Sequence, residues 1–175
     1  VTGQELTDAG YVGPFTVNGA GTVVNYLAYD VVASRGLYYA SDDGSLSSKS
    51  ITLQIEARLI NDSGTPIGSW EIIATEVISG TTTTAQRRSY RYAVTSGRYE
   101  TRILRTDAKD ASTRAGHEMN WTGLRAYVPG AQAYGDITLL AVRIQATNQL
   151  SNLSSRKFNA IVTRKLSEWD GSGWS

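Results

Sequence analysis

The run Thr52-Leu53-Gln54-Ile55-Glu56-Ala57-Arg58-Leu59 alternates polar and apolar side chains with a period of two residues. Successive side chains of a β-strand point to opposite faces, so this alternation predicts a strand that is buried on one face. We expect the four apolar members of the run in a core and the four polar members to face water. The dense turn signal Asn61-Asp62-Ser63-Gly64-Thr65-Pro66 ends the strand.

Three further strands are expected after this turn. Residues 70–78 resume the extended pattern, with Trp70, Ile72 and Ala74 predicted to share one face. Residues 90–105 alternate again around Thr95-Ser96-Gly97, where Gly suits a positive φ. We therefore predict a β-hairpin over residues 90–105.

The flanking segments extend the same pattern. Residues 23–32 are apolar on both faces and predict a central strand, and residues 117–127 predict a strand that bends at Gly123. Residues 137–146 and 157–166 predict two more strands, and period two fits the first of these better than a helix over residues 136–145 does. Many short strands punctuated by turns, with no long helix, predict an all-β sandwich or barrel.

Composition narrows the classes of function. A chain of 175 residues with 41% hydrophobic residues is long enough for one packed domain. The net charge of +1 gives no general attraction to nucleic acid or to an anionic membrane. The absence of cysteine excludes disulfides and thiolate metal sites. No apolar run approaches the roughly 20 residues that span a bilayer, and the first residues lack the pattern of a signal peptide.

No combination of residues predicts catalysis, and we expect no enzyme and no catalytic residue. His117 is the one histidine, beside Glu118, and is expected at a surface or loop edge near Trp121. The spacing of Glu71, Glu76, Glu100 and Glu118 gives no reason for any two to meet as glycosidase carboxylates do. A Gly-x-Ser-x-Gly elbow is missing from the sequence.

We also expect no metal site and no cofactor. The run Asp42-Asp43-Gly44-Ser45 and the pair Asp107 and Asp110 could suggest calcium, but they lack the ligand spacing of an EF-hand. Turn chemistry explains these aspartates without a metal.

Arginines and aromatic residues leave binding functions open. The most basic region holds Arg87, Arg88, Arg91, Arg98, Arg102 and Arg105, interleaved with Tyr90, Tyr92 and Tyr99. It could imitate a nucleic-acid surface, but the near-zero net charge favours an outward arginine face over an inward aromatic face, and protein docking is the better interpretation. Sugar stacking is the other open interpretation, on rings drawn from Trp70, Trp121, Tyr127 and Tyr134.

An ordered set of short motifs carries a family resemblance. It comprises Gly13-Pro14-Phe15, Asp30-Val31-Val32 with Arg35-Gly36-Leu37-Tyr38, Gly97-Arg98-Tyr99-Glu100 with Arg105-Thr106-Asp107, Gly123-Leu124-Arg125-Ala126-Tyr127, Tyr134-Gly135-Asp136 and residues 143–166. In this order the motifs resemble the tail-tip attachment or host-specificity proteins (protein J family) of lambda-like long-tailed bacteriophages. Each motif is short, so the resemblance rests on their combination. Ala33-Ser34 departs from the family, which often has a proline there.

The resemblance implies an antiparallel β-sandwich of fibronectin-III, immunoglobulin or jelly-roll type. It implies a module over residues 1–166 and a truncated linker over residues 167–175, in which Trp169 and Trp174 are poorly packed. The full-length protein that contains this module, its parent, would be a large trimeric structural protein. It would be made in the bacterial cytoplasm and placed at the virion's tail tip. Its partners would be other tail-tip proteins and copies of itself, with a host surface protein or glycan as the alternative, and neither nucleic acid nor membrane.

Overall fold

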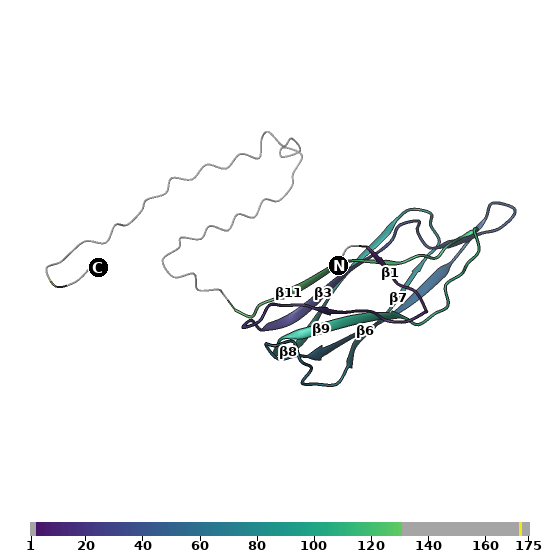
Figure 1. Ribbon diagram of the computed structural model, residues 1–175. Helices are drawn as coiled ribbons and strands as arrows, with labels where there is room; N and C mark the ends of the chain where they lie inside the picture. Colours follow the sequence, from purple (N-terminus) through teal and green to yellow (C-terminus); the bar gives the residue numbers. More distant parts are fainter. Residues whose placement is uncertain (1–2, 131–171, 173–175) are drawn as a thin grey trace. The chain divides into compact units, whose positions relative to one another are not determined.

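The computed structural model describes residues 3–130 and residue 172, and in them the chain forms strands, turns and bends but no helix (Figure 1). The chain divides into two units, Val1–Ala131 and Gln132–Ser175, and all described strands belong to the first. Some predictions lie outside the described residues. These are the strands expected over 137–146 and 157–166, the boundary after Leu166, and the positions of Tyr134, Trp169 and Trp174.

Two antiparallel four-stranded sheets form the fold, so the predicted all-β sandwich is confirmed. The first sheet has the order β1-β11-β3-β8, the second has the order β2-β9-β6-β7, and a small third sheet has the order β10-β4-β5. The strands are β1 (Gln4–Glu5), β2 (Val12–Thr16), β3 (Val24–Ala33), β4 (Tyr38–Ala40), β5 (Leu46–Ser47), β6 (Lys49–Leu59), β7 (Glu71–Gly80), β8 (Gln86–Gly97), β9 (Tyr99–Arg105), β10 (Ala115–Gly116) and β11 (Asn120–Tyr127).

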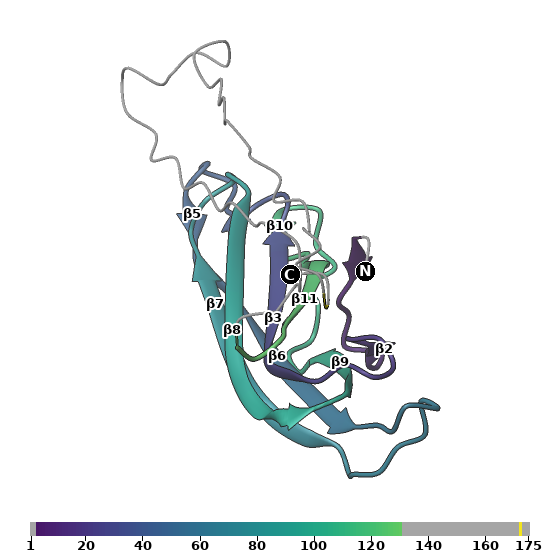
Figure 2. The ribbon, with the colours of Figure 1, turned by 90° about the vertical axis from the view of Figure 1, so that its left-hand side faces the viewer.

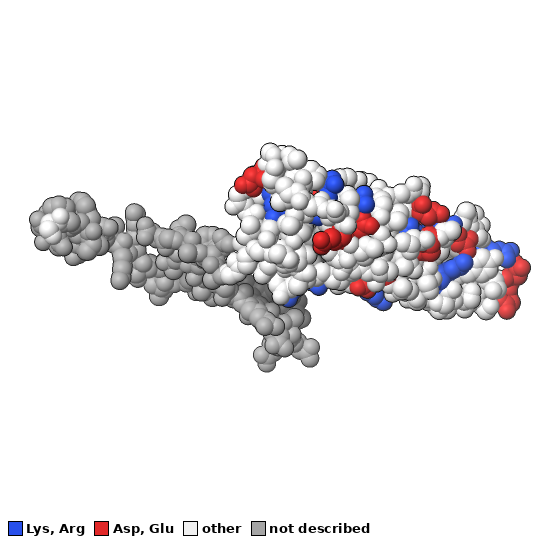
Figure 3. All heavy atoms as spheres, turned by 90° about the horizontal axis from the view of Figure 1, so that it is seen from below, with Lys and Arg blue, Asp and Glu red and all other residues white. Residues whose placement is uncertain are grey.

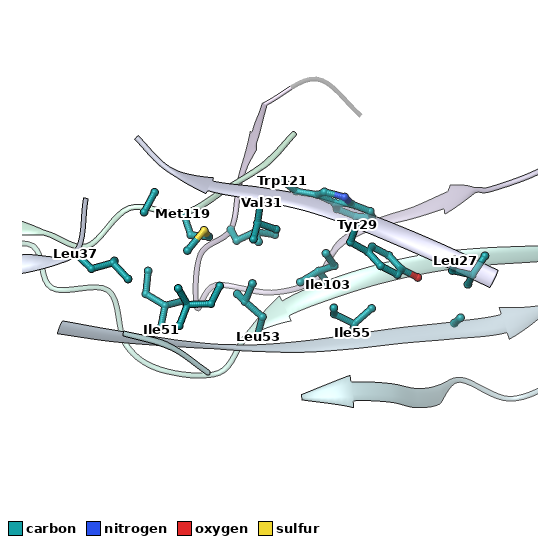
Figure 4. Packing of buried hydrophobic residues seen from close by; sticks show 14 of the residues in the cluster. Leu27, Tyr29, Val31, Leu37, Ile51, Leu53, Ile55, Ile103, Met119 and Trp121 are labelled. Carbon is teal, nitrogen blue, oxygen red and sulfur yellow. The ribbon is translucent and has the colours of Figure 1, made fainter. Parts of the chain in front are cut away.

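The core lies between the facing rows of β3 and β6. Figure 4 shows Leu27, Tyr29 and Val31 of β3 opposite side chains of β6 and β9. Leu53 and Ile55 are completely buried and Ala57 nearly so, while Leu59 at the strand end is only partly buried. The expectation of a central strand over residues 23–32 is confirmed, because β3 is paired on both edges and buried on both faces.

Among the described residues Trp121 is the largest side chain that is fully buried, and it packs against rings from both sheets. Its ring centre lies 5.3 Å from that of Phe15 and 5.9 Å from that of Tyr29. Its indole N–H donates to the Gly123 carbonyl at 2.8 Å, across a β-bulge between Trp121 and Gly123. The bend predicted at Gly123 is therefore confirmed.

A buried polar chain joins the sheets inside this apolar core. The Thr101 hydroxyl donates to the Glu56 carbonyl oxygen at 2.7 Å, and the Tyr29 hydroxyl lies 2.8 Å from the Thr101 oxygen. Because the Thr101 proton is already used, Tyr29 is the donor of the second bond. Burial raises the pKa of Tyr29 well above 10.0, although the Thr101 contact lowers it somewhat, so the phenol keeps its proton.

The hairpin predicted over residues 90–105 is wrong. β8 pairs with β3 in the first sheet, whereas β9 pairs with β6 and β2 in the second, so the chain changes sheets between Gly97 and Tyr99. Gly97 is buried, and a Cβ atom there would lie 2.4 Å from Leu59 Cδ2. The Tyr99 hydroxyl donates back to the Thr95 carbonyl at 2.7 Å, as tyrosine corners do in immunoglobulin-type sandwiches.

The terminal strands occupy unusual places in the two sheets. In an immunoglobulin-type sandwich the first strand joins the sheet of the second strand, and the last strand joins the other sheet. Here the last described strand, β11, pairs with β3, while the N-terminal β2 pairs with β9 in the opposite sheet. The short β1 reaches the first sheet only by pairing with β11.

Replacing Tyr99 by phenylalanine tests the corner. Tyr99→Phe removes the hydrogen bond to Thr95 and keeps the ring, so we expect a loss of about 1 kcal/mol in the free energy of unfolding. Urea denaturation followed by tryptophan fluorescence measures this loss. Tyr26→Phe is the matched control on the outer face of β3 and should change stability by less than about 0.5 kcal/mol. Equal effects of the two substitutions would contradict the role assigned to the corner.

Candidate protein interface

The outer face of the second sheet carries a row of aromatic and arginine side chains. The guanidinium carbon of Arg102 lies 3.7 Å from the Tyr11 ring centre and 4.1 Å from the Trp70 ring centre. The guanidinium carbon of Arg58 lies 4.4 Å from the same Trp70 ring. Each such cation–π contact contributes about 0.5–1 kcal/mol at an exposed site. We call these four residues the arginine ladder.

Two carboxylates fix the ladder in place. Glu100 accepts a 2.5 Å hydrogen bond from Arg58, and Glu56 accepts bonds of 2.7 Å from Arg102 Nε and 2.7 Å from the Tyr11 hydroxyl. The prediction that Glu56 faces water is wrong, because its donors cover it and leave it 5% exposed. On the face that Figure 3 shows, acidic and basic side chains are likewise interspersed over a mostly uncharged surface.

The hydrogen bonds to the Glu56 carboxylate lower its pKa by more than burial raises it. Burial alone would raise the pKa of this carboxyl, but hydrogen bonds from Tyr11, Arg102 and Gln54 together hold its pKa below the ordinary value of 4.5. The same bond to Glu56 is the main cause that raises the pKa of Tyr11. At neutral pH the carboxylate is therefore charged and the phenol remains a donor.

Two apolar side chains are exposed on the edge strand β7, and Ile72 lies beside the ladder because it pairs with Glu56. Ile72 is 59% exposed and Val77 is 62% exposed. The prediction that Trp70, Ile72 and Ala74 share one face is wrong, because a bulge pairs Ile55 with Ala74 and Glu56 with Ile72. The extra residue turns Ala74 toward the core side, with Ile55, and leaves Ile72 on the outer side, with Glu56.

The predicted basic region is divided between distant faces. Arg87, Arg88 and Arg91 are exposed on β8 of the first sheet, with the inward tyrosines that the sequence predicted. On the second sheet Arg102 belongs to the ladder, and Arg98 donates to the Asn18 and Asn61 carbonyls. Six arginines that are neighbours in sequence therefore form no single nucleic-acid surface.

Three of the four aromatic candidates for sugar stacking lie in the described residues, and each of these is buried or contacts a guanidinium group. Trp121 is inside the core, and the Trp70 ring is covered by the two guanidinium groups of the ladder. Tyr127 is 39% exposed, and the guanidinium carbon of Arg91 lies 5.4 Å from its ring centre.

His117 is buried, which corrects the expectation of a surface or loop-edge position. Its Nδ1 accepts the Asp110 backbone N–H at 2.9 Å, so Nε2 carries the proton and donates it to the Ser50 carbonyl at 2.8 Å. The guanidinium of the fully buried Arg105 side chain donates to the His117 carbonyl at 2.8 Å and to Asp107 at 2.7 Å. Sequence reasoning missed this cluster, because its parts come from β6, β9 and the following loop.

The remaining acidic candidates have separate structural partners. Asp43 accepts two hydrogen bonds from Ser45 within its turn, and Asp110 pairs with Lys49 at 2.5 Å. Glu76 accepts the Tyr92 hydroxyl, and Glu118 lies 3.8 Å from Lys109. Within the described residues no cluster of three or more acidic or histidine side chains is placed to hold a metal ion. In the same residues no helix is long and apolar enough to span a membrane.

A cavity of about 290 Å³ opens beside the ends of β6, β7 and β8. Arg58, Ile73, Val94 and Tyr99 are among its lining residues, and Glu71 is the one carboxylate among them. The four glutamates considered from sequence do not converge there.

Two antiparallel sheets joined by a tyrosine corner define a fibronectin-III-like β-sandwich module. The model of the family described as Tip attachment protein J, FNIII-A domain, matches residues 3–130, and the chain belongs to this family. Membership makes the chain a structural component of the phage tail tip, and it favours the fibronectin-III-like form over the jelly roll. No curated protein matches the chain.

The pKa of Glu56 predicts an acid-sensitive contribution to stability. Because the folded-state pKa is lowered, this contribution is fully present above pH 4.5 and is lost as pH falls through the lower folded value. Glu56→Gln should cost about 1–3 kcal/mol at neutral pH and should flatten the acid limb of the stability curve. Denaturant unfolding at a series of pH values measures both effects. Glu118→Gln is the control, and an equally flattened curve there would contradict the assignment.

The buried guanidinium of Arg105 predicts a second stability effect. Arg105→Met keeps an unbranched apolar stem but removes the guanidinium, so the His117 carbonyl and Asp107 Oδ2 lose their arginine donor, and we expect a loss of about 3–5 kcal/mol. Thermal and denaturant unfolding check the size of the loss. Arg35→Met, in an exposed turn, should shift stability by less than about 0.5 kcal/mol. A loss of under about 1 kcal/mol for Arg105→Met would be inconsistent with a buried, fully used guanidinium.

Proposed function

We propose that the module is a non-enzymatic scaffold that binds a neighbouring tail-tip protein, or another copy of its parent, through the arginine ladder. It contributes directly to tail-tip assembly and indirectly to host attachment. It needs no metal or cofactor, and it is made in the host cytoplasm before it enters the virion.

The ordered state of the ladder is the observation that supports this proposal. Tyr, Trp and Arg are the residues that dominate binding energy at protein interfaces. Ordering long side chains on binding normally costs entropy, and Glu56 and Glu100 already hold both ladder arginines in the free module. The exposed Ile72, which pairs with Glu56, adds apolar area beside the ladder, and the exposed Val77 lies farther along β7.

Carbohydrate or receptor binding by the aromatic residues is the alternative, and the geometry supports it less. A sugar needs a free ring face, whereas guanidinium groups lie over the rings of Trp70 and Tyr127. Glycan-array binding that Trp70→Ala abolishes without unfolding would favour this alternative over the scaffold.

Substitution of Ile72 in the phage that encodes this chain tests the docking role. Ile72→Lys places a charge at the exposed margin of the ladder while leaving the core intact, so we expect fewer complete tail tips and at least about a tenfold lower plaque titre. Electron microscopy of purified particles counts the complete tips. Val23→Lys, at another exposed apolar position outside this face, is the matched control. Normal tips with Ile72→Lys and Trp70→Ala together would refute this docking surface.

A further inference from the structure

The free edge of β8 is a second candidate surface, separate from the ladder. β8 is 12 residues long, pairs with β3 along one side and ends the first sheet (Figure 2). An edge strand presents unpaired backbone N–H and C=O groups that can accept another strand. At the other edge of the same sheet β1 has only 2 residues, so β8 offers the longer template.

Charge on this edge has one sign. Arg87 and Arg91 pair with Val32 and Ala28 in register, so they lie on the same outer face as Ser89, which pairs with Asp30. Asp30 bonds Ser89 at 2.6 Å and Arg125 at 2.6 Å. Among the described residues neither Arg87 nor Arg91 forms an ion pair, so two exposed positive charges remain on the outer face of the strand. The exposed Arg88 lies on the other face and donates to the Arg87 carbonyl at 3.0 Å.

Aromatic contacts order one of these charges. The Arg91 guanidinium carbon lies 4.5 Å from the Tyr26 ring centre and 5.4 Å from the Tyr127 ring centre. Tyr26 and Tyr127 face each other on the neighbouring strands β3 and β11. The guanidinium is therefore held above the sheet, with hydrogen-bonding capacity left for a carboxylate.

The positive charge along the β8 edge determines which kind of polypeptide can pair with it. A second copy that paired β8 with β8 would bring arginines together, which is destabilising across strands. Acidic side chains at alternate positions of an added strand would instead lie beside Arg87 and Arg91, because both strands repeat every two residues. Backbone pairing favours a polypeptide over a nucleic acid, which cannot complete the strand ladder.

We propose that the β8 edge binds an extended acidic segment of another protein as an added β-strand. The inference rests on the proposed docking role of the module, but it concerns a different surface and can fail separately.

A peptide of about ten residues that alternates threonine and glutamate tests the inference on the whole chain. We expect saturable binding by calorimetry, amide shifts along β8 by NMR, and weaker binding as salt rises. Arg87→Gln with Arg91→Gln should weaken binding about fivefold to tenfold. Arg114→Gln, which removes one charge elsewhere, and Ile72→Lys should leave it unchanged.

Three results would overturn the proposal. One is equal binding of a threonine–glutamine peptide, and another is tighter binding of oligothymidylate with the same β8 shifts. The third is that the peptide does not bind and the double variant self-associates. This result would mean that the two arginines prevent β8 from pairing with another strand. Any of these results, combined with defective tail tips for Ile72→Lys, would leave the ladder proposal standing.

Discussion

The chain passes from the first sheet to the second between Gly97 and Tyr99. This crossing is the constraint that decides on which outer face the arginines of β8 and β9 lie. A Cβ atom at Gly97 would lie 2.4 Å from Leu59 Cδ2, so a larger residue there would require the Leu59 side chain to move, and the Tyr99 hydroxyl closes the crossing onto Thr95. A hairpin at this point would have put β8 and β9 in one sheet, with Arg91 and Arg102 on neighbouring strands. The crossing instead sends Arg91 to one outer face and Arg102 to the other.

The inner and outer parts of the second sheet meet at Glu56. Its carbonyl accepts the buried Thr101 hydroxyl, while its side chain accepts Tyr11 and Arg102 on the outer face. Glu56, whose side chain binds the ladder, is therefore fixed through its backbone by Thr101, and Thr101 in turn accepts a hydrogen bond from Tyr29 in the other sheet. The ladder is therefore positioned by the core, and a neighbouring protein would contact a surface that has little left to order.

Local sequence patterns predicted well which side chains are buried, but they predicted poorly which strands pair. The alternation in residues 52–59 was enough to place Leu53, Ile55 and Ala57 in the core, because strand geometry alone decides which face a side chain takes. The same kind of evidence failed at residues 90–105, since a glycine between two alternating runs is compatible with a change of sheet as well as with a hairpin. Gly97 also lacks the positive φ expected of it. Glu56 also escaped prediction, because its donor Tyr11 is distant in sequence and a strand pattern carries no information on such partners.

The position of β11 also determines the order in which the fold can be completed during synthesis. The strands of the second sheet are all present once Arg105 has left the ribosome, but the first sheet lacks the strand that lies between β1 and β3 until Tyr127 follows. Trp121, which fills the space beside Phe15 and Tyr29, arrives with that last strand. A nascent chain without it has a gap of indole size between its sheets, so the core closes only at the end of translation of this module.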